Sequence, residues 1–387
     1  MSEVIEKCHQ EALRLLHRNL TPDGILAATR TEKSQSRRYD CIFGRDAAIC
    51  TLAMVLSGDA KLVQGAKNSL LTLARHQAEN GQIPKYVDTK RHEPDFWYVG
   101  CIDATLWWLV ALNFIARHAP DMALEKKLKP HVQRAITWLQ CQEHPRLHLL
   151  QQNEASDWAD IMPRSGFVLY TNALWYYVKQ QYGLARAKQT RYHFNHLFHP
   201  FSHDVPGYRR LQLLTHYARS KAKNRDLYLS FVNFSFWGEE GDVFGNLLAI
   251  LFGLADAKQA RRILRALDKA AIAARHPVRV TCMPIRRTDS LWRAYMARHR
   301  QNFELRYHNG GIWPFIGGFW VMTLALLGKR RLAARQLERL ARVNAINGWE
   351  FNEWFHGKTG KPSGMAGQSW NAAMYLLALR ALESNIF

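Results

Sequence analysis

Apolar residues recur three and four positions apart through most of this 387-residue chain. This spacing places them on one face of an α-helix, whereas the strict alternation typical of β-strands is rare. No low-complexity linker divides the chain, which predicts one all-α domain over residues 1–387, with an N-terminal helix and lead-in at residues 1–38. The predicted helices cover residues 5–18, 45–57, 60–79, 101–118, 123–141, 166–182, 207–222, 242–254, 257–273, 317–327, 330–345 and 369–383.

The connections between the predicted helices differ in length and composition. Short breaks, such as those at residues 57–59 and 328–329, join neighbouring helices into hairpins. The longer connections are rich in Gly, Pro, Trp, Asp and Glu, and they cover residues 81–100, 142–166, 274–311 and 347–368. Six hairpins closed into a ring would place these loops on one rim. Long loops inside a compact domain are usually functional, so we expect the site there.

The sequence predicts no cofactor, metal or membrane anchor. The six cysteines are isolated and form no C-x-x-C pair, so no zinc or disulfide pattern is present. No stretch approaches the ~20 apolar residues that a membrane span requires. The first twenty residues contain three Glu and lack the apolar run of a signal peptide. We therefore expect a cytoplasmic protein.

The formal net charge of +21 admits two interpretations. One is an anionic partner such as nucleic acid, and the other is a solvated outer face on several helices. Arg261, Arg262 and Arg265 alternate with apolar residues at helical spacing, and the segment 329–339 repeats this pattern. Because no nucleic-acid recognition motif accompanies the charge, the solvated face is favoured and no nucleic-acid partner is predicted. A homo-oligomer is compatible with the sequence.

Two acidic clusters in the long connections could carry chemistry. Asp157, Trp158 and Asp160 precede one predicted helix, where an acid can cap the helix or act as a general acid. Capping is the better interpretation of Asp157, whereas Asp160 lies in an irregular stretch ending in Pro and Arg and suits catalysis. The second cluster places Glu350 and Glu353 among aromatic residues, a combination that suits sugar binding and proton transfer.

Three further polar groups occur beside apolar helices. Arg45 and Asp46 stand at a predicted helix start, where they could bind sugar hydroxyls or cap the helix. Asp103 opens an otherwise apolar helix and needs a polar partner if it is buried. His308 lies in a Gly-rich segment with Trp313, where it could bind substrate or be purely structural.

The order and spacing of these segments resemble the alkaline/neutral invertases of glycoside hydrolase family 100 and bacterial proteins of the amylo-α-1,6-glucosidase type. The resemblance covers almost the whole chain after residue 38. Its blocks are Tyr39-Asp40-x-x-Phe43-x-Arg45-Asp46, Asp103 to Trp108, Gly241 to Ala255, Tyr307-His308-Asn309-Gly310-Gly311-x-Trp313-Pro314 and Gln368-Ser369-Trp370-Asn371-Ala372.

This resemblance implies an (α/α)6 toroid with its active site on one rim, no metal and inversion at the anomeric carbon. It implies that Asp160 is the general acid and Glu353 the general base. The residues implied to bind the substrate are Arg45, Asp46, Asp103, Asp157, Trp158, His308, Trp313, Trp354 and Gln368.

The chain departs from the invertase pattern at two places. Ile161-Met162 replaces two basic residues after the acid, and Glu350-Phe351-Asn352 intervenes after Trp349. The second departure leaves Glu350 and Glu353 as alternatives for the base. Both leave the substrate open among sucrose, an α-1,6-linked glucan branch and a short α-gluco-oligosaccharide.

The expected mechanism is proton donation by Asp160 to the leaving oxygen while Glu353 activates water. A neutral acid beside an ionised base needs different surroundings, so we expect burial, Asp157 and Glu154 to raise the pKa of Asp160. Two alternatives remain: a sugar epimerase or lyase on the same fold, which would use paired histidines, and a non-catalytic basic binding protein.

Overall fold

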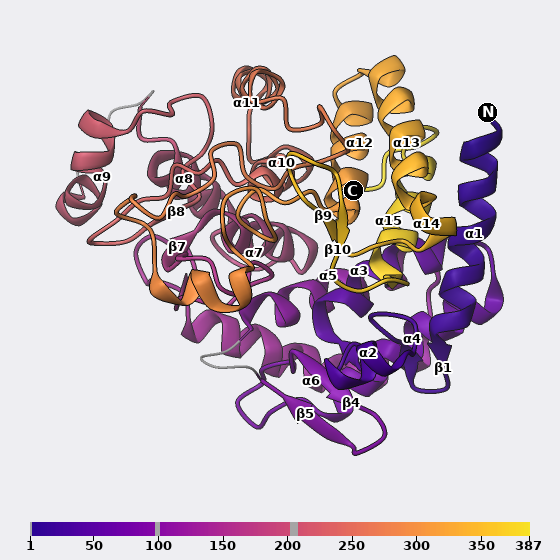
Figure 1. Ribbon diagram of the computed structural model, residues 1–387. Coiled ribbons are helices and arrows are strands. Elements are labelled where there is room, and N and C mark those ends of the chain that lie inside the picture. Colours follow the sequence, from indigo (N-terminus) through magenta and orange to yellow (C-terminus); the bar gives the residue numbers. More distant parts are fainter. Residues whose placement is uncertain (1, 97–100, 202–207) are drawn as a thin grey trace.

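The computed structural model describes residues 2–96, 101–201 and 208–387, and the protein is rich in helices, as predicted (Figure 1). Part of the predicted connection 81–100 therefore lies outside the described residues. The longer helices are α1 (Glu3–Asn19), α3 (Gly44–Leu56), α4 (Ala60–Arg75), α5 (Ile102–His118), α6 (Met122–Cys141), α7 (Leu169–Gln181), α8 (Ala187–Phe198), α9 (Arg209–Lys221), α10 (Val243–Leu251), α11 (Ala257–Lys269), α12 (Pro314–Leu326), α13 (Arg330–Asn344) and α15 (Ser369–Arg380). The short ones are α2 (Glu32–Ser36), η1 (Ala294–Arg300) and α14 (Ile346–Trp349).

Six helices contact one another in a closed series. Helix α3 packs on α5, α5 on α7, α7 on α10, α10 on α12, α12 on α15, and α15 returns to α3. These helices are apolar on nearly all sides, and most of their residues are buried. A helix that is hydrophobic all round must lie inside a protein, which explains why this series forms the core.

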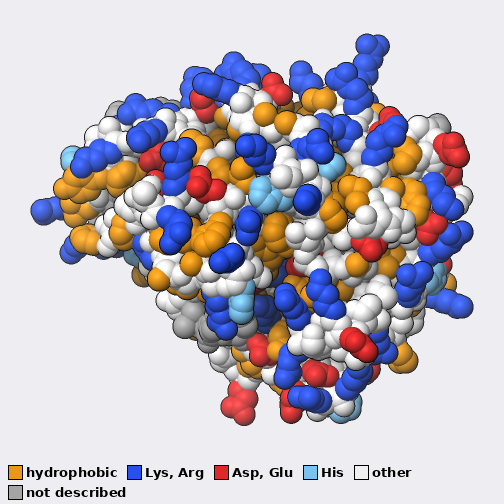
Figure 2. Space-filling view, in the orientation of Figure 1, with side chains coloured by type: hydrophobic (Ala, Val, Ile, Leu, Met, Phe, Trp, Pro, Cys, Tyr) orange, Lys and Arg blue, Asp and Glu red, His pale blue; other side chains and the backbone are white. Residues whose placement is uncertain are grey.

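A second set of helices covers the first from outside. Helices α4, α8, α11 and α13 each contact the inner helix that precedes them in the chain, while α6 contacts α4 and α5, and α1 packs on α13 and α15. Helices α11 and α13 are amphipathic, with buried Ile and Leu on one side and basic residues on the other. The predicted solvated basic faces are therefore confirmed for these two helices. Figure 2 shows Lys and Arg spread over the visible surface rather than gathered in one stripe.

The strands are short and antiparallel, and they lie in the connections. Strands β3 (Ile42–Phe43), β4 (Tyr86–Asp88) and β5 (Glu93–Asp95) form one sheet, and β6 (Gln151–Gln152), β7 (Gly166–Val168) and β8 (Phe231–Val232) form another. Strand β1 (Leu20–Thr21) pairs with β2 (Gly24–Ile25), and β9 (Trp354–Phe355) pairs with β10 (Pro362–Ser363).

The predicted helices differ from the observed ones mainly around α7 and α8. The predicted helix 166–182 begins too early, because residues 166–168 pair as β7 with β6 and β8. Helix α8 was not predicted; only Thr190, Phe194, Leu197 and Phe198 of its residues are buried, which leaves a narrow apolar face among Lys, Arg and His. The predicted helix 207–222 corresponds to α9, which lies at the edge of the molecule (Figure 1).

Two searches of the described residues bear on membrane and metal binding. None of the described helices combines the length and apolar character needed to cross a bilayer. The described ranges likewise contain no group of three or more His, Cys, Asp or Glu arranged to hold a metal ion.

Candidate active site

A cavity of about 650 Å³ opens where several inner helices begin. Arg45 and Asp46 lie in the first turn of α3, Trp313 directly precedes α12, and Trp370 is the second residue of α15. The connections supply the other walls. The lining residues are Ser36, Arg37, Arg38, Tyr39, Phe43, Arg45, Asp46, Lys85, Tyr86, Trp158, Asp160, Ile161, Arg298, His299, Gln301, Tyr307, His308, Trp313, Glu353 and Trp370.

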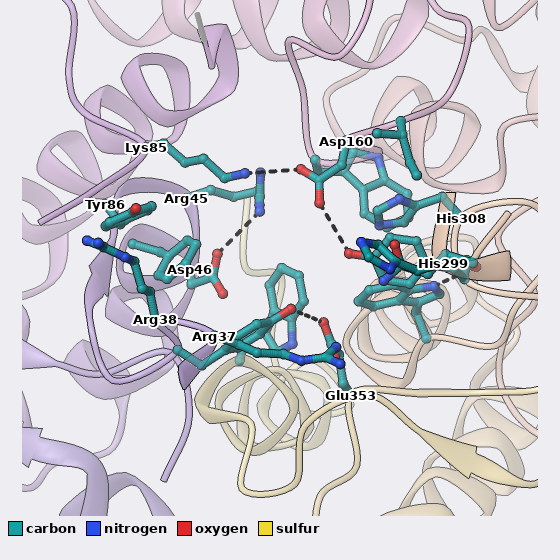
Figure 3. A pocket seen from close by; sticks show the side chains of 18 of the residues that line it. Arg37, Arg38, Arg45, Asp46, Lys85, Tyr86, Asp160, His299, His308 and Glu353 are labelled. Atoms are coloured by element: carbon teal, nitrogen blue, oxygen red, sulfur yellow. Dashed lines mark hydrogen bonds and ion pairs between the residues drawn. The ribbon is translucent and has the colours of Figure 1, made fainter. Parts of the chain in front are cut away.

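Asp160 is held in the cavity wall by two partners from other segments. Lys85, just before β4, places its Nζ 3.3 Å from Asp160 Oδ1, and the Tyr307 hydroxyl donates to Oδ2 at 3.2 Å (Figure 3). Burial acts to raise the pKa of Asp160, but the positive charges of Lys85 and Arg45 outweigh it and hold this pKa below its usual range. Asp160 is therefore an ionised carboxylate in the free protein.

Glu353 faces the same cavity from a different side (Figure 3). The Tyr39 hydroxyl donates to its Oε1 at 2.7 Å, and the backbone N–H of Met365 donates to Oε2 at 2.9 Å. Burial raises the pKa of Glu353 to about 7, although both hydrogen bonds act to lower it. No cation is paired with Glu353 among the described residues, which explains why its pKa moves opposite to that of Asp160.

A glycine opposite Glu353 fixes the position of this carboxylate. Gly364 has φ +80°, and a Cβ at this position would stand 2.1 Å from Glu353 Oε2. We expect Gly364→Ala to displace Glu353 and to lower kcat by about 100-fold, since misplacement of a catalytic group by ~1 Å costs roughly that factor. The measurement is kcat in a sugar-release assay with the α-glucosides that the sequence resemblance leads us to expect as substrates.

Gly58→Ala is the matched control for Gly364→Ala. Gly58 has φ +74°, but nothing lies within 4 Å of the position that an alanine methyl group would take there. Both variants carry the same backbone strain, and only Gly364→Ala meets a carboxylate. Equal losses of kcat in the two variants would show that strain alone accounts for the effect.

Arg45 and Asp46 form the buried polar floor of the cavity. Arg45 lies 3.5 Å from Asp46 Oδ2 and 3.2 Å from Asp103 Oδ2, and Asp103 also accepts a hydrogen bond from Tyr170 at 3.0 Å. Burial raises the pKa of Asp46 to about 6 against the opposing charge of Arg45. Asp103 thus holds the Arg45 guanidinium in place from the side that faces away from the cavity.

Aromatic rings form the rest of the floor. The His308 ring stacks on Trp313 at 4.9 Å, and Trp158 meets His308 edge-on at 4.8 Å. Burial lowers the pKa of His308 to about 3, so this ring is neutral. Among the described residues, five buried polar atoms on the cavity wall have no hydrogen-bond partner: Arg45 Nε, Asp46 Oδ2, Trp158 Nε1, His308 Nδ1 and Trp370 Nε1. Buried polar atoms need partners, so these atoms are ready to bind hydroxyl groups of a ligand.

The structure brings most of the predicted site residues together, but four lie behind the wall. Arg45, Asp46, Trp158, Asp160, His308, Trp313 and Glu353 line the cavity, whereas Asp103, Asp157, Trp354 and Gln368 do not. Asp157 accepts hydrogen bonds from Gln152 and from the backbone of Ala159, so it stabilises a local turn; it does not cap the following helix as expected, because the N-cap of α7 is Val168. Glu350 accepts a hydrogen bond from Asn347 and is also absent from the cavity wall.

The expectation that the pKa of Asp160 is raised is wrong: burial acts in that direction, but the net shift is downward and neither Asp157 nor Glu154 is among its main causes. Glu154 accepts a hydrogen bond from Tyr295 at 2.5 Å and lies 3.7 Å from Arg293. Lys85 is the dominant charge beside Asp160, and it lowers the pKa. No motif around Lys85 indicated this contact from the sequence.

Sequence reasoning missed several other residues of the cavity. Tyr39 and Tyr307 stand in the family blocks, so their positions could have identified them as partners of the two acids. The exposed Arg37, Arg38 and Arg298 had no such signal, because they belong to the connections that differ most from any motif.

The fold is that of a class of helical proteins that includes solved glycosidase structures. The chain is similar to the GH63 mannosylglycerate hydrolase from Thermus thermophilus in complex with Tris and D-glycerate, with a TM-score of 0.68 and 16% identity over 96% of this chain and 99% of that one. It is also similar to a solved structure named wild-type glycosidase, with a TM-score of 0.63 and 15% identity over 99% of both chains. At these identities the likeness establishes the fold alone.

Within that class, residues 232–385 match the family model of the alkaline and neutral invertases. Cytosolic invertase 1 of Oryza sativa subsp. japonica is 30% identical over 146 residues, which cover 36% of this chain and 25% of the relative. Neutral/alkaline invertase 1, mitochondrial, of the same organism is 32% identical over 146 residues, or 36% of this chain and 22% of the relative.

These matches span about a quarter of the length of the plant invertases, 25% for the first. The matched family region contains Glu353, His308 and Trp313 but not Asp160 or Asp46. The resemblance to alkaline/neutral invertases that the sequence motifs predicted is confirmed.

Proposed function

We propose that this protein is an inverting, exo-acting glycoside hydrolase that cleaves an α-glucosidic bond with the carboxyl pair Asp160 and Glu353. The single observation that carries the proposal is the placement of the partly buried Asp160 and the buried Glu353 on one cavity with opposite pKa shifts. Glycosidases of this chemistry use two carboxyl groups, one to protonate the leaving oxygen and one to activate water. As part of the same proposal, the closed helix series is the inner ring of an (α/α)6 toroid in a single domain.

The cavity floor suits the glycone of such a substrate. Asp46 Oδ2, Trp158 Nε1, His308 Nδ1 and Trp370 Nε1 offer unpaired acceptors and donors to the hydroxyls of a sugar ring. The aromatic faces beside them can cover the apolar face of that ring. The floor does not discriminate between sucrose, an α-1,6-linked glucan branch and a short α-gluco-oligosaccharide.

The two carboxyls share one proton over a range of pH. In the free protein Glu353, with a pKa of about 7, holds this proton and Asp160 is ionised. The catalytic arrangement has the same proton on Asp160 and an ionised Glu353, so both arrangements carry equal charge and coexist in a fixed ratio between the two pKa values. Asp160 then protonates the leaving oxygen, and Glu353 deprotonates a water molecule that attacks the opposite face of the sugar.

This sharing sets the expected pH dependence of kcat/KM. The pair loses its single proton as pH rises through about 7, the pKa of Glu353, so activity falls above neutral pH. At the acidic side, activity falls only when Asp160 and Glu353 are both protonated, below the ordinary pKa range of Asp160.

Removal of the Lys85 charge tests the acidic limb of this profile. Lys85 lowers the pKa of Asp160, so Lys85→Met should raise that pKa and move the acidic limb of kcat/KM upward by about 1 pH unit or more. Lys258→Met, an exposed lysine of α11, is the control. An acidic limb that stays at the wild-type pH would contradict the assignment of Lys85 as the residue that keeps Asp160 ionised.

The experiment that tests the proposed activity is sugar release from sucrose, isomaltose, maltose and glycogen-derived dextrin. Hydrolysis of one of them, lost in Asp160→Asn and in Glu353→Gln, supports the proposal and identifies the substrate. Release that survives both substitutions would contradict the assignment of the pair.

The two alternatives have less support from the cavity. An epimerase with paired histidines needs two imidazoles that gain and lose protons near neutral pH. Of the two histidines among the described lining residues, His299 and His308, the second has a pKa of about 3 and is too weak a base for such a pair. A binding protein for polyanions would present a continuous basic stripe, whereas the visible basic residues are dispersed (Figure 2). A cytoplasmic location, as the name of Cytosolic invertase 1 suggests for that relative, belongs to the same proposal.

A further inference from the structure

The charges that line the cavity change from balanced at the floor to positive at the mouth. At the floor, Arg45 pairs with Asp46 and Asp103, and Lys85 pairs with Asp160. The described lining residues include three acids, Asp46, Asp160 and Glu353, and all three lie inside the cavity rather than at its mouth. The exposed mouth instead carries the side chains of Arg37, Arg38, Arg298 and His299.

These basic side chains come from two separate segments on different sides of the mouth. Figure 3 shows Arg37 and Arg38 on the side of Asp46, and His299 on the side of Asp160 and His308. A ligand that extends outward between the two acids would therefore meet positive charge from two directions.

The acidic side chains near the mouth compensate little of the charge of Arg37 and Arg38. Asp88 is 3.9 Å from Arg38 but lies at the same distance from Arg91, so its charge is divided between two arginines. Arg37 forms no ion pair with any residue that the structure describes. Exposed pairs at such distances contribute little free energy, so the guanidinium groups of Arg37 and Arg38 can bind a ligand at little cost.

Both segments are fixed to the site rather than loosely attached. A capping box between Thr31 and Ser34 fixes the start of α2, which ends at Ser36 directly before Arg37, and Lys33 donates to the backbone oxygen of Gly364 beside Glu353. On the other side, Asn302 donates to the backbone oxygen of Ile161 and accepts from the backbone of His308. The basic mouth therefore keeps a defined position relative to both catalytic carboxyls.

We infer that the leaving group of the substrate carries an oxyanion, a carboxylate or a phosphate ester, which Arg37, Arg38 and Arg298 bind at the cavity mouth. This inference rests on the proposed hydrolase function. The buried floor receives the glycone, so the leaving group points past Asp160 and Glu353 toward the arginines. Arginine is the side chain best suited to carboxylate and phosphate, because its planar N–H groups match their oxygens, whereas a neutral sugar gains little from three arginines.

The test compares matched neutral and anionic substrates. Sucrose is paired with sucrose 6′-phosphate, and 4-carbamoylphenyl α-glucopyranoside is paired with 4-carboxyphenyl α-glucopyranoside. We expect kcat/KM to favour the anionic member of at least one pair by about 10- to 100-fold, as a charge-assisted hydrogen bond implies. The pair with the larger ratio identifies the anion. High salt should reduce this ratio, because the arginines are exposed.

The variant for this test is the triple substitution Arg37→Gln, Arg38→Gln and Arg298→Gln, which should bring the anionic-to-neutral ratio close to one. The matched control replaces three exposed arginines of outer helices, Arg261→Gln, Arg331→Gln and Arg335→Gln, and should keep the wild-type ratio. The control lowers the net charge of the protein without touching the mouth. A ratio that falls equally in both variants would assign the preference to overall charge and overturn the inference.

Failure of the inference and failure of the proposed function give different results. Hydrolysis of both members of each pair at equal kcat/KM overturns the anionic site and leaves the hydrolase function intact. Calorimetric titration of Asp160→Asn with the same four compounds measures binding without turnover. Equal affinity for charged and neutral members in this variant would overturn the inference independently of hydrolysis, and tighter binding of the charged members, lost on triple substitution, supports it.

Discussion

Asp160→Asn should lower kcat on sucrose or isomaltose by about 100- to 10,000-fold, the usual contribution of a general acid. The amide cannot donate the proton that the leaving oxygen needs, although it keeps the shape of the carboxyl group. Lys85 and Tyr307, which contact the two Asp160 oxygens, can still bind the amide in part, so the fold should be unchanged. The measurement is steady-state kcat beside a thermal unfolding curve.

α-Glucosyl fluoride separates the roles of the two acids. Fluoride leaves without protonation, so Asp160→Asn should retain most of its activity on this substrate. Glu353→Gln should stay inactive, because the attacking water still needs a base. The reverse pattern, with Glu353→Gln active on the fluoride, would exchange the two roles, as the raised pKa of Glu353 by itself would suggest. If both variants still hydrolyse the fluoride, neither residue belongs to the mechanism.

Arg164→Met should lower the free energy of unfolding by about 3–5 kcal/mol, the cost of leaving buried charges without their partner. Arg164 lies 3.3 Å from Glu240 and 3.3 Å from Asp242, and all three side chains are at most 2% exposed. Burial already raises the pKa of Asp242, and Arg164 opposes this shift. Without the guanidinium, both acids must be protonated or hydrated. Urea unfolding at neutral pH measures the loss.

An exposed ion pair provides the control for Arg164→Met. Arg342 and Glu338 lie 2.6 Å apart on the solvent face of α13, and their side chains are 65% and 36% exposed. Arg342→Met should change the free energy of unfolding by no more than ~0.5 kcal/mol, because such pairs are solvated. A cost for Arg164→Met as small as that of the control would show that water or protonation already neutralises Glu240 and Asp242.

The position of Glu353, the proposed general base, illustrates how much the sequence alone could predict. The family pattern left Glu350 and Glu353 as alternatives, because Glu350-Phe351-Asn352 intervenes after Trp349 in this chain. In the structure Glu353 precedes β9 and turns into the cavity, where Tyr39 and Met365 bind it, whereas Glu350 bonds to Asn347 outside. Glu350 and Glu353 are only three residues apart, yet one carboxyl is peripheral and the other is buried. No local helix or strand propensity distinguishes the two positions.

The sequence by itself determined the secondary structure class and seven of the twenty described residues that line the cavity. Repeated apolar spacing required helices, and the wholly apolar ones, such as α12, could only be buried. Motif order identified Asp160, Glu353, Arg45 and Asp46 because local blocks carry these residues. Helix α8 was not predicted, because its apolar face is narrow and because tertiary packing, rather than helix propensity, stabilises it.

Only the tertiary structure decided the electrostatics of the site. Lys85 and Asp160 are 75 positions apart, and Tyr39 and Glu353 are 314 apart, so no sequence window contains either pair. The pKa of each acid depends on the balance between its burial and the nearest charge, and both quantities arise only when distant segments pack together. For the same reason the basic mouth, with Arg37 and Arg298 from distant parts of the chain, was visible in composition only as unassigned positive charge.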